Sequence, residues 1–207
     1  PGVIPVALPI CVFCAASDQI APHYFSLARG LGEEMARRGH SLVFGAGQTG
    51  LMGEVARAVH QTGGTVIGVI PRRLDWKEVV YESADELIYT DTMRERKAIM
   101  AERASAFIIL PGGIGTLEEG LEIITLRHLG YHTKPIVVLD GHGYFAPLLA
   151  MLERSVREGF TQPSLMEAYY IAKDVDDALH RVEEHADAPV GVDPITPAVE
   201  GTPDRRA

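Results

Sequence analysis

The sequence predicts a Rossmann-like α/β fold, in which a doubly wound parallel sheet lies between two layers of helices within a single domain. Short runs rich in Val, Ile and Leu alternate along the chain with amphipathic segments of helical periodicity. The apolar runs show little alternation with polar residues, as expected for strands that helices cover on both faces. The length of 207 residues is typical of one such domain.

The elements follow from these two patterns in chain order. The expected strands are residues 6–14, 41–44, 65–70, 106–110, 135–139 and 169–172. The expected helices are residues 22–38, 51–61, 93–104, 117–129, 144–158 and 175–184. Regular alternation of strand and helix implies parallel strands joined by right-handed crossovers. From Ala186 onward the chain is rich in Pro, Asp and Thr without periodicity, so we expect a folded domain over 1–185 and a flexible tail over 186–207.

The charge balance excludes one class of partner. With a formal net charge of −9, the chain cannot assemble the broad basic face that binds a nucleic-acid backbone. A small phosphorylated ligand remains compatible, because one loop and one or two cations suffice to bind it. No apolar run approaches about 20 residues, so we expect no membrane span and a cytoplasmic protein. Cys11 and Cys14, three apart in a strand, should point to opposite faces as buried thiols.

Four loops are the expected location of the chemistry. In open α/β sheets, ligands bind beyond the carboxyl ends of the strands. This rule selects residues 15–20, 45–50, 71–80 and 111–116.

The loop at 45–50 fits the pattern G-x-G-x-x-G between a strand and a helix. A dinucleotide site would also need a carboxylate at the end of the next strand, yet that strand runs into Arg72 and Arg73. Either arginine could meet a 2′-phosphate, so binding of NADP stays open. The structural alternative, a tight turn with close packing of helix on strand, accounts for Gly50 and Gly53.

The loop at 111–116, with glycines at 112, 113 and 115, is more specific. It joins the strand at 106–110 to a helix expected from Leu117. Glycines let the backbone turn sharply and direct several N–H groups to one point, where the helix N-terminus adds partial positive charge. No Lys-Ser/Thr pair follows, so the loop is not a triphosphate P-loop, and a monophosphate fits better.

Three charged side chains near this loop have competing interpretations. Glu119 is either a catalytic carboxylate or the third helical residue of a capping box whose N-cap is Thr116. Arg96 and Lys97 lie three and four residues from both Met93 and Met100, so they lie on an apolar side of their helix. A cation there indicates a waiting anion.

These motifs resemble the Lonely Guy (LOG) family of cytokinin riboside 5′-monophosphate phosphoribohydrolases, many members of which carry the older label of lysine decarboxylase. The resemblance rests on PGGIGTLEE at 111–119, where the family has PGGxGTxxE, and on MRERK at 93–97. It extends over GAGQTGLMG at 45–53, LRHLGYHTKPIVVLD at 126–140 and GYFAPLL at 143–149, and covers residues 10–172. The chain departs from the family at CAAS (14–17), where CGSS is frequent, and at Ala46, where a third glycine is common.

The resemblance implies site residues and partners. Arg96 and Glu119 match the two essential catalytic positions of the family. The matching substrate contacts are Ser17, Gly47, Glu78, Lys97, Gly112, Gly113, Gly115, Thr116, Leu117, Glu118 and Thr125. The family needs no cofactor or metal and forms homodimers, with the helix expected at 117–129 near the shared surface.

The implied activity is hydrolysis of the N-glycosidic bond of a purine nucleoside 5′-monophosphate, with adenine or an N6-substituted adenine as the base. Glu119 would stabilise the oxocarbenium-like ribose and orient water, with Glu118 as a helper. Arg96 would position the phosphate or ribose, supported by Lys97. The alternative is a non-catalytic nucleotide or cofactor carrier on the same scaffold. The decarboxylase label finds no support, because none of Lys77, Lys97, Lys134 and Lys173 has a recognisable Schiff-base setting.

Overall fold

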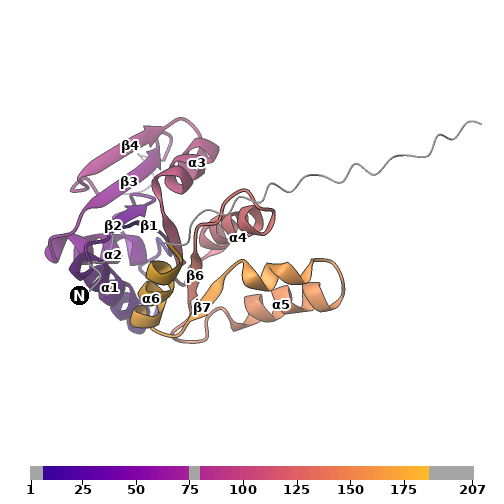
Figure 1. The fold of residues 1–207 in the computed structure, drawn as a ribbon. Helices are drawn as coiled ribbons and strands as arrows, with labels where there is room; N and C mark the ends of the chain where they lie inside the picture. Colours follow the sequence, from indigo (N-terminus) through magenta and orange to yellow (C-terminus); the bar gives the residue numbers. More distant parts are fainter. Residues whose placement is uncertain (1–6, 75–79, 187–207) are drawn as a thin grey trace, which may run out of the picture.

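The computed structural model, which describes residues 7–74 and 80–186, contains a seven-stranded parallel sheet (Figure 1). Its strands run in the order β4-β3-β2-β1-β5-β6-β7. Their bounds are β1 Pro9–Phe13, β2 Ser41–Phe44, β3 Val66–Pro71, β4 Glu86–Thr90, β5 Ala106–Ile109, β6 Ile136–Leu139 and β7 Tyr170–Ala172. The predicted doubly wound α/β fold is therefore confirmed.

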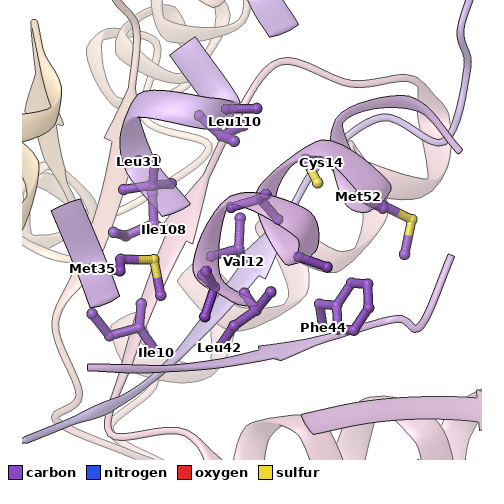
Figure 2. Close-up of a cluster of buried hydrophobic side chains, with 14 of the residues drawn as sticks. Ile10, Val12, Cys14, Leu31, Met35, Leu42, Phe44, Met52, Ile108 and Leu110 are labelled. Carbon is purple, nitrogen blue, oxygen red and sulfur yellow. The ribbon is translucent and has the colours of Figure 1, made fainter. Parts of the chain in front are cut away.

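Helices cover both faces of this sheet. The bounds are α1 Pro22–Arg37, α2 Gly50–Gln61, α3 Met93–Arg103, α4 Ile114–His128, α5 Ala146–Arg157 and α6 Val175–Ala186, with a short 3₁₀ helix at Pro163–Glu167. One buried cluster joins the sheet to α1, α2 and α6, and a second joins it to α3, α4 and α5. Figure 2 shows the first cluster, where Ile10 and Val12 of β1 lie near Leu31 and Met35 of α1. Each face is thus dry and closely packed.

The two cysteines follow the alternation of side chains along a strand. Cys11 belongs to the cluster beneath α3, α4 and α5, whereas Cys14 belongs to the opposite cluster. Both thiols are free and buried. The expectation of core thiols on opposite faces is confirmed.

One strand and several boundaries differ from the sequence prediction. The prediction omitted β4, because ELIYT at the sheet edge has only Thr90 buried and lacks the continuous apolar run of the inner strands. The predicted helix at 117–129 begins three residues earlier, at Ile114. The predicted tail begins at the last residue of α6, and residues 187–207 lie outside the described part of the chain. None of the helices in the described part is long and apolar enough to cross a membrane.

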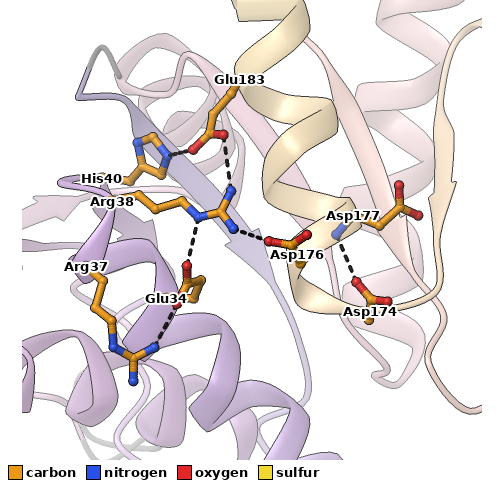
Figure 3. Close-up of polar contacts among 8 residues, drawn as sticks. All are labelled: Glu34, Arg37, Arg38, His40, Asp174, Asp176, Asp177 and Glu183. Atoms are coloured by element: carbon orange, nitrogen blue, oxygen red, sulfur yellow. Dashed lines mark hydrogen bonds and ion pairs between the residues drawn. The ribbon is translucent and has the colours of Figure 1, made fainter. Parts of the chain in front are cut away.

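A charged network ties the end of α1 to α6 (Figure 3). The guanidinium of Arg38 contacts Glu34 at 2.9 Å, Asp176 at 2.5 Å and Glu183 at 3.1 Å. The fully buried His40 ring shares Glu183, with Nε2 2.9 Å from Oε1, and accepts a hydrogen bond from the backbone amide of Leu8 through Nδ1. One guanidinium therefore bridges three carboxylates from two helices.

Replacing Arg38 by Met is expected to lower the free energy of unfolding by about 2 kcal/mol, because three converging carboxylates lose their shared donor. Urea unfolding of the purified variant measures this loss. Arg37→Met is the matched control, since the neighbouring Arg37 has a 55% exposed side chain and pairs only with carboxylates of its own helix. Equal effects of the two substitutions would contradict a special role for Arg38.

Candidate active site

A cavity of about 350 Å³ lies at the carboxyl edge of the sheet. After β1 the chain builds the sheet outward to β4, and it then returns to place β5 on the other side of β1. The loops after β1 and β5 therefore diverge at this topological switch point, where ligands of open α/β sheets bind. All four loops selected from the sequence contribute to the lining, through Ala15, Ala16, Ser17, Gly45, Leu74, Gly113, Gly115 and Thr116.

The glycine loop after β5 presents the N-terminus of α4 to this cavity. The first amide that donates along the helix is that of Leu117, to the carbonyl of Gly113 at 3.0 Å. The amides at 114–116 precede it and have no partner within the helix, so they supply donors and partial positive charge to an anion. Thr116 is buried at this end, and a Cβ on Gly112 would lie 2.1 Å from its Oγ1. Gly112 thus permits the turn, although it does not itself line the cavity.

The early start of α4 rules out one of the two interpretations of Glu119. The N-cap is Gly113, and no side chain caps this helix. Thr116 lies inside the first turn, so the capping box of Thr116 with Glu119 is wrong. The sequence placed the helix start too late because Gly113 and Gly115 are poor helix formers. Glu119 instead lines the cavity, where its carboxylate can meet a ligand.

The second glycine loop, at 45–50, is closed to a phosphate. At the N-terminus of α2, the amide of Gly50 donates to Asp18 Oδ1 at 2.7 Å, and that of Leu51 donates to the carbonyl of Ala15 at 2.9 Å. A carboxylate already occupies the position where a dinucleotide site holds pyrophosphate. Gly50 has φ +60°, and a Cβ on Gly53 would lie 1.8 Å from the carbonyl of Gln48. The turn-and-packing interpretation of Gly50 and Gly53 is confirmed, and the arrangement argues against NADP.

The backbone at Ala46 adopts a conformation that favours glycine, the residue common at this position in the family. Its φ of 60° lies in the left-handed region, which costs a side chain about 1–2 kcal/mol. Its methyl group lies over Gly68, where a Cβ would come within 2.8 Å of the Ala46 Cβ. The alanine is therefore accommodated without displacing the loop, because β3 has a glycine beneath it.

Arg96 lies at the junction of two strand ends. The capping box of Thr92 with Glu95 fixes the start of α3 one turn before it. Its side chain is only 6% exposed, and it donates from Nε to the carbonyl of Val69 at 3.1 Å and from Nη2 to the carbonyl of Gly45 at 3.0 Å. A Cβ on Gly45 would lie 1.7 Å from Nη2, so only glycine leaves room for the guanidinium. The buried cation borders the same cavity as Glu119.

The negative charge of Glu119 also affects the pKa of a buried thiol, that of Cys14. Burial, and then the negative charge of Glu119, raise the pKa of Cys14 well above its ordinary value. Cys14 lines the cavity, but as a neutral thiol it is an unsuitable nucleophile. The carboxylate and guanidinium are therefore the chemically capable pair at this site. No group of three or more His, Cys, Asp or Glu side chains in the described ranges is arranged to hold a metal ion.

Lys97 lies beside the main cavity, not on its wall. It borders an adjacent cavity of about 150 Å³, which shares Phe13 and Glu119 with the first. Its ammonium pairs with Glu118 and, at 2.6 Å, with Glu122. The hydrogen bonds that Lys97 donates to Glu118 and then to Glu122 raise the pKa of Lys97, so it stays charged. Glu118 lines the main cavity and is at the same time paired with this lysine.

The remaining predicted contacts are dispersed. Ser17 lines the main cavity, where its Oγ accepts a hydrogen bond from the amide of Gln19. Gly47 does not, since it packs against Met52. Leu117 lies in apolar contacts between α4 and α5, and Thr125 is exposed on α4, with its hydroxyl donating to the carbonyl of Leu121. Glu78 lies outside the described residues.

Several lining residues escaped the sequence analysis. The sequence drew attention to Gly47, whereas Gly45, the first glycine of the same motif, borders the cavity and Arg96. Three methionines and a leucine also line it, namely Met52, Met93, Met100 and Leu74. Apolar residues at helical spacing look like ordinary core positions, so the pattern held no signal for them.

The chain is similar in sequence to a known family and to several of its members. The family model described as "Possible lysine decarboxylase" matches residues 52–182. The chain is 46% identical over 176 residues to the "Probable cytokinin riboside 5′-monophosphate phosphoribohydrolase LOGL9" of Oryza sativa subsp. japonica, covering 85% of this chain and 78% of the relative. It is 45% identical over 170 residues to the cytokinin riboside 5′-monophosphate phosphoribohydrolase of Mycobacterium tuberculosis, covering 82% and 90%.

A solved structure of the molybdenum cofactor carrier protein from Chlamydomonas reinhardtii aligns with a TM-score of 0.65 and 23% identity, over 86% of this chain and 97% of that one. At that identity the likeness shows the fold alone. The sequence relatives are far closer, and they span nearly the whole described domain. This chain belongs to the LOG family of cytokinin riboside 5′-monophosphate phosphoribohydrolases, as its paired motifs predict.

Proposed function

We propose that the protein hydrolyses the N-glycosidic bond of an adenine-type nucleoside 5′-monophosphate to a free base and ribose 5-phosphate. The observation that carries this proposal is that Arg96, Glu119 and the N-terminus of α4 border one cavity. An anion site, a buried guanidinium and a carboxylate are the groups that such a reaction needs within reach of one another.

The phosphate end of the substrate is the anchor. The backbone amides at the start of α4 donate hydrogen bonds to the phosphoryl oxygens, and Thr116 adds a hydroxyl at the same end of the cavity. This binding energy, remote from the reacting carbon, orients the ribose. A nucleoside without the phosphate loses that orientation and reacts poorly.

The bond cleavage assigns separate roles to the two charged groups. As the bond between C1′ and the base nitrogen breaks, its electron pair leaves with the purine and positive charge develops on the ribose. Glu119 stabilises this charge and accepts a proton from the water that attacks C1′, while the departing base takes up a proton. Arg96, fixed by the carbonyls of Gly45 and Val69, positions the phosphate or ribose.

The apolar lining favours an N6-substituted base. Met52, Met93, Met100 and Leu74 give the cavity flexible, polarizable walls that adapt to an aliphatic substituent. We therefore propose that an isoprenoid-substituted adenine is preferred over adenine itself.

A homodimer is part of the proposal. Ile114 is 85% exposed at the start of α4, and the cavity beside Lys97 opens between α3 and α4. Lys97 and Thr125, two of the predicted contacts outside the main cavity, would then serve the shared surface. Sedimentation velocity tests this: a monomer at micromolar concentration would argue against it.

The product profile tests the function. Isopentenyladenosine monophosphate should be hydrolysed with kcat/KM at least about tenfold above that of AMP, because several methylene groups become buried. Adenosine should fall at least about 100-fold below AMP, because it lacks the anchoring phosphate. Chromatography of the released base and an assay of ribose 5-phosphate measure both ratios.

The carrier alternative makes the opposite prediction. A carrier would bind AMP, as measured by calorimetry, and would release neither base nor ribose 5-phosphate. Binding without turnover would therefore refute the hydrolase and favour the carrier.

A further inference from the structure

Hydrogen bonds to three consecutive backbone carbonyls hold the glycine loop in place. Each of its three consecutive carbonyls, at 111, 112 and 113, accepts one hydrogen bond from a donor elsewhere. The bonds are Ala15 N to Pro111 O at 3.2 Å, Tyr144 Oη to Gly112 O at 2.7 Å and Leu117 N to Gly113 O at 3.0 Å. Only the bond from Tyr144 comes from a side chain.

Tyr144 is itself firmly placed. It lies in the connection between β6 and α5, where the amide of Phe145 donates to Asp140 Oδ1 at 3.1 Å. Its ring meets Phe145, which is 1% exposed, edge-on at 5.1 Å between centroids, and Tyr24 at 6.0 Å. With two rings holding it, the hydroxyl is a fixed donor for the loop.

The hydrogen bond from Tyr144 affects the cavity through the peptide bond between Gly112 and Gly113. In a trans peptide, the carbonyl of one residue and the N–H of the next point in opposite directions. A donor that holds the Gly112 carbonyl therefore turns the N–H of Gly113 away from Tyr144, and Gly113 lines the cavity whereas Tyr144 does not. Hydrogen bonding to the carbonyl also polarises the same peptide, which strengthens its N–H as a donor.

We propose that Tyr144 is a positioning residue for substrate, which acts through the Gly112–Gly113 peptide to orient a phosphate-binding amide. This inference rests on the proposed function, since it deepens the role of the anion site. Its role is confined to ground-state binding of a phosphoryl group, because Tyr144 is not among the residues that line the cavity.

The test is Tyr144→Phe, assayed against phosphorylated and unphosphorylated ligands. The inhibition constant of ribose 5-phosphate and the KM for AMP should both rise about fivefold, as one net hydrogen bond is lost. The kcat for AMP and the kcat/KM for adenosine should stay within about twofold of the unmodified protein. Tyr24→Phe, which removes a hydroxyl from the ring beside Tyr144, is the matched control and should change neither constant.

Two results would overturn the inference. One is an unchanged inhibition constant for ribose 5-phosphate in Tyr144→Phe. The other is an equal loss of kcat/KM for AMP and adenosine, which a general disturbance of the fold would cause. If the unmodified protein has no hydrolase activity, the proposed function fails, and calorimetric binding of ribose 5-phosphate to both forms still decides the role of Tyr144.

Discussion

Glu119→Gln is expected to lower the kcat for AMP by about 10²–10⁴-fold, with a change in KM of no more than about threefold. The amide keeps the size of the carboxylate but loses the charge that, in the proposed mechanism, stabilises the oxocarbenium-like ribose, and the basicity that activates water. Single-turnover release of ribose 5-phosphate measures the chemical step. Because the phosphate anchor at the start of α4 is untouched, substrate should still bind.

Glu118→Gln is the matched control, one residue away on the same helix. The Glu118 side chain is 53% exposed and pairs with Lys97, so its carboxylate is screened by solvent and engaged with a cation. We expect its kcat to stay within about tenfold of the unmodified protein. If Glu118→Gln were the inactive variant and Glu119→Gln the active one, the assignment of the catalytic carboxylate would be reversed.

The fold is predictable from the sequence where strands are buried on both faces. Every residue of a strand such as Ile136–Leu139 is buried, and the continuous apolar run makes the strand recognisable in the sequence. The edge strand Glu86–Thr90 is not predictable in this way. It is partly exposed to solvent, so it contains polar residues and lacks a continuous apolar run. Helix starts at glycine are equally obscure, since Gly113 caps α4 without a side chain.

The site is predictable to the level of motifs but not of contacts. The apolar helix side singles out Arg96 and predicts an anion beside it, yet among the described residues the oxygen atoms that accept its hydrogen bonds are the carbonyls of Gly45 and Val69, far away in the sequence. The same argument predicts an anion beside Lys97, and its anionic partners are the carboxylates of Glu118 and Glu122 in the same chain. Tertiary pairing of this kind leaves no periodic signal.

Arg96→Lys is expected to reduce kcat/KM for AMP by about 10²–10³-fold although the positive charge is kept. A guanidinium donates in several fixed directions, and here two of them hold the ends of β2 and β3 while the side chain borders the cavity. An ammonium on a flexible stem cannot satisfy both carbonyls and also face the substrate. At least one buried carbonyl then loses its donor, so the free energy of unfolding should fall by about 1–3 kcal/mol.

Measuring both quantities separates positioning from folding. Arg103→Lys, at the other end of the same helix, is the control, since Arg103 pairs with Glu86 at the surface and should leave turnover unchanged. Loss of stability with normal turnover in Arg96→Lys would mean that the guanidinium only ties strand ends together. Loss of turnover at a temperature where the variant remains folded would show that the guanidinium acts in the reaction. Its hydrogen bonds to the two carbonyls would then fix its position, and its place at the cavity would explain its effect on the rate.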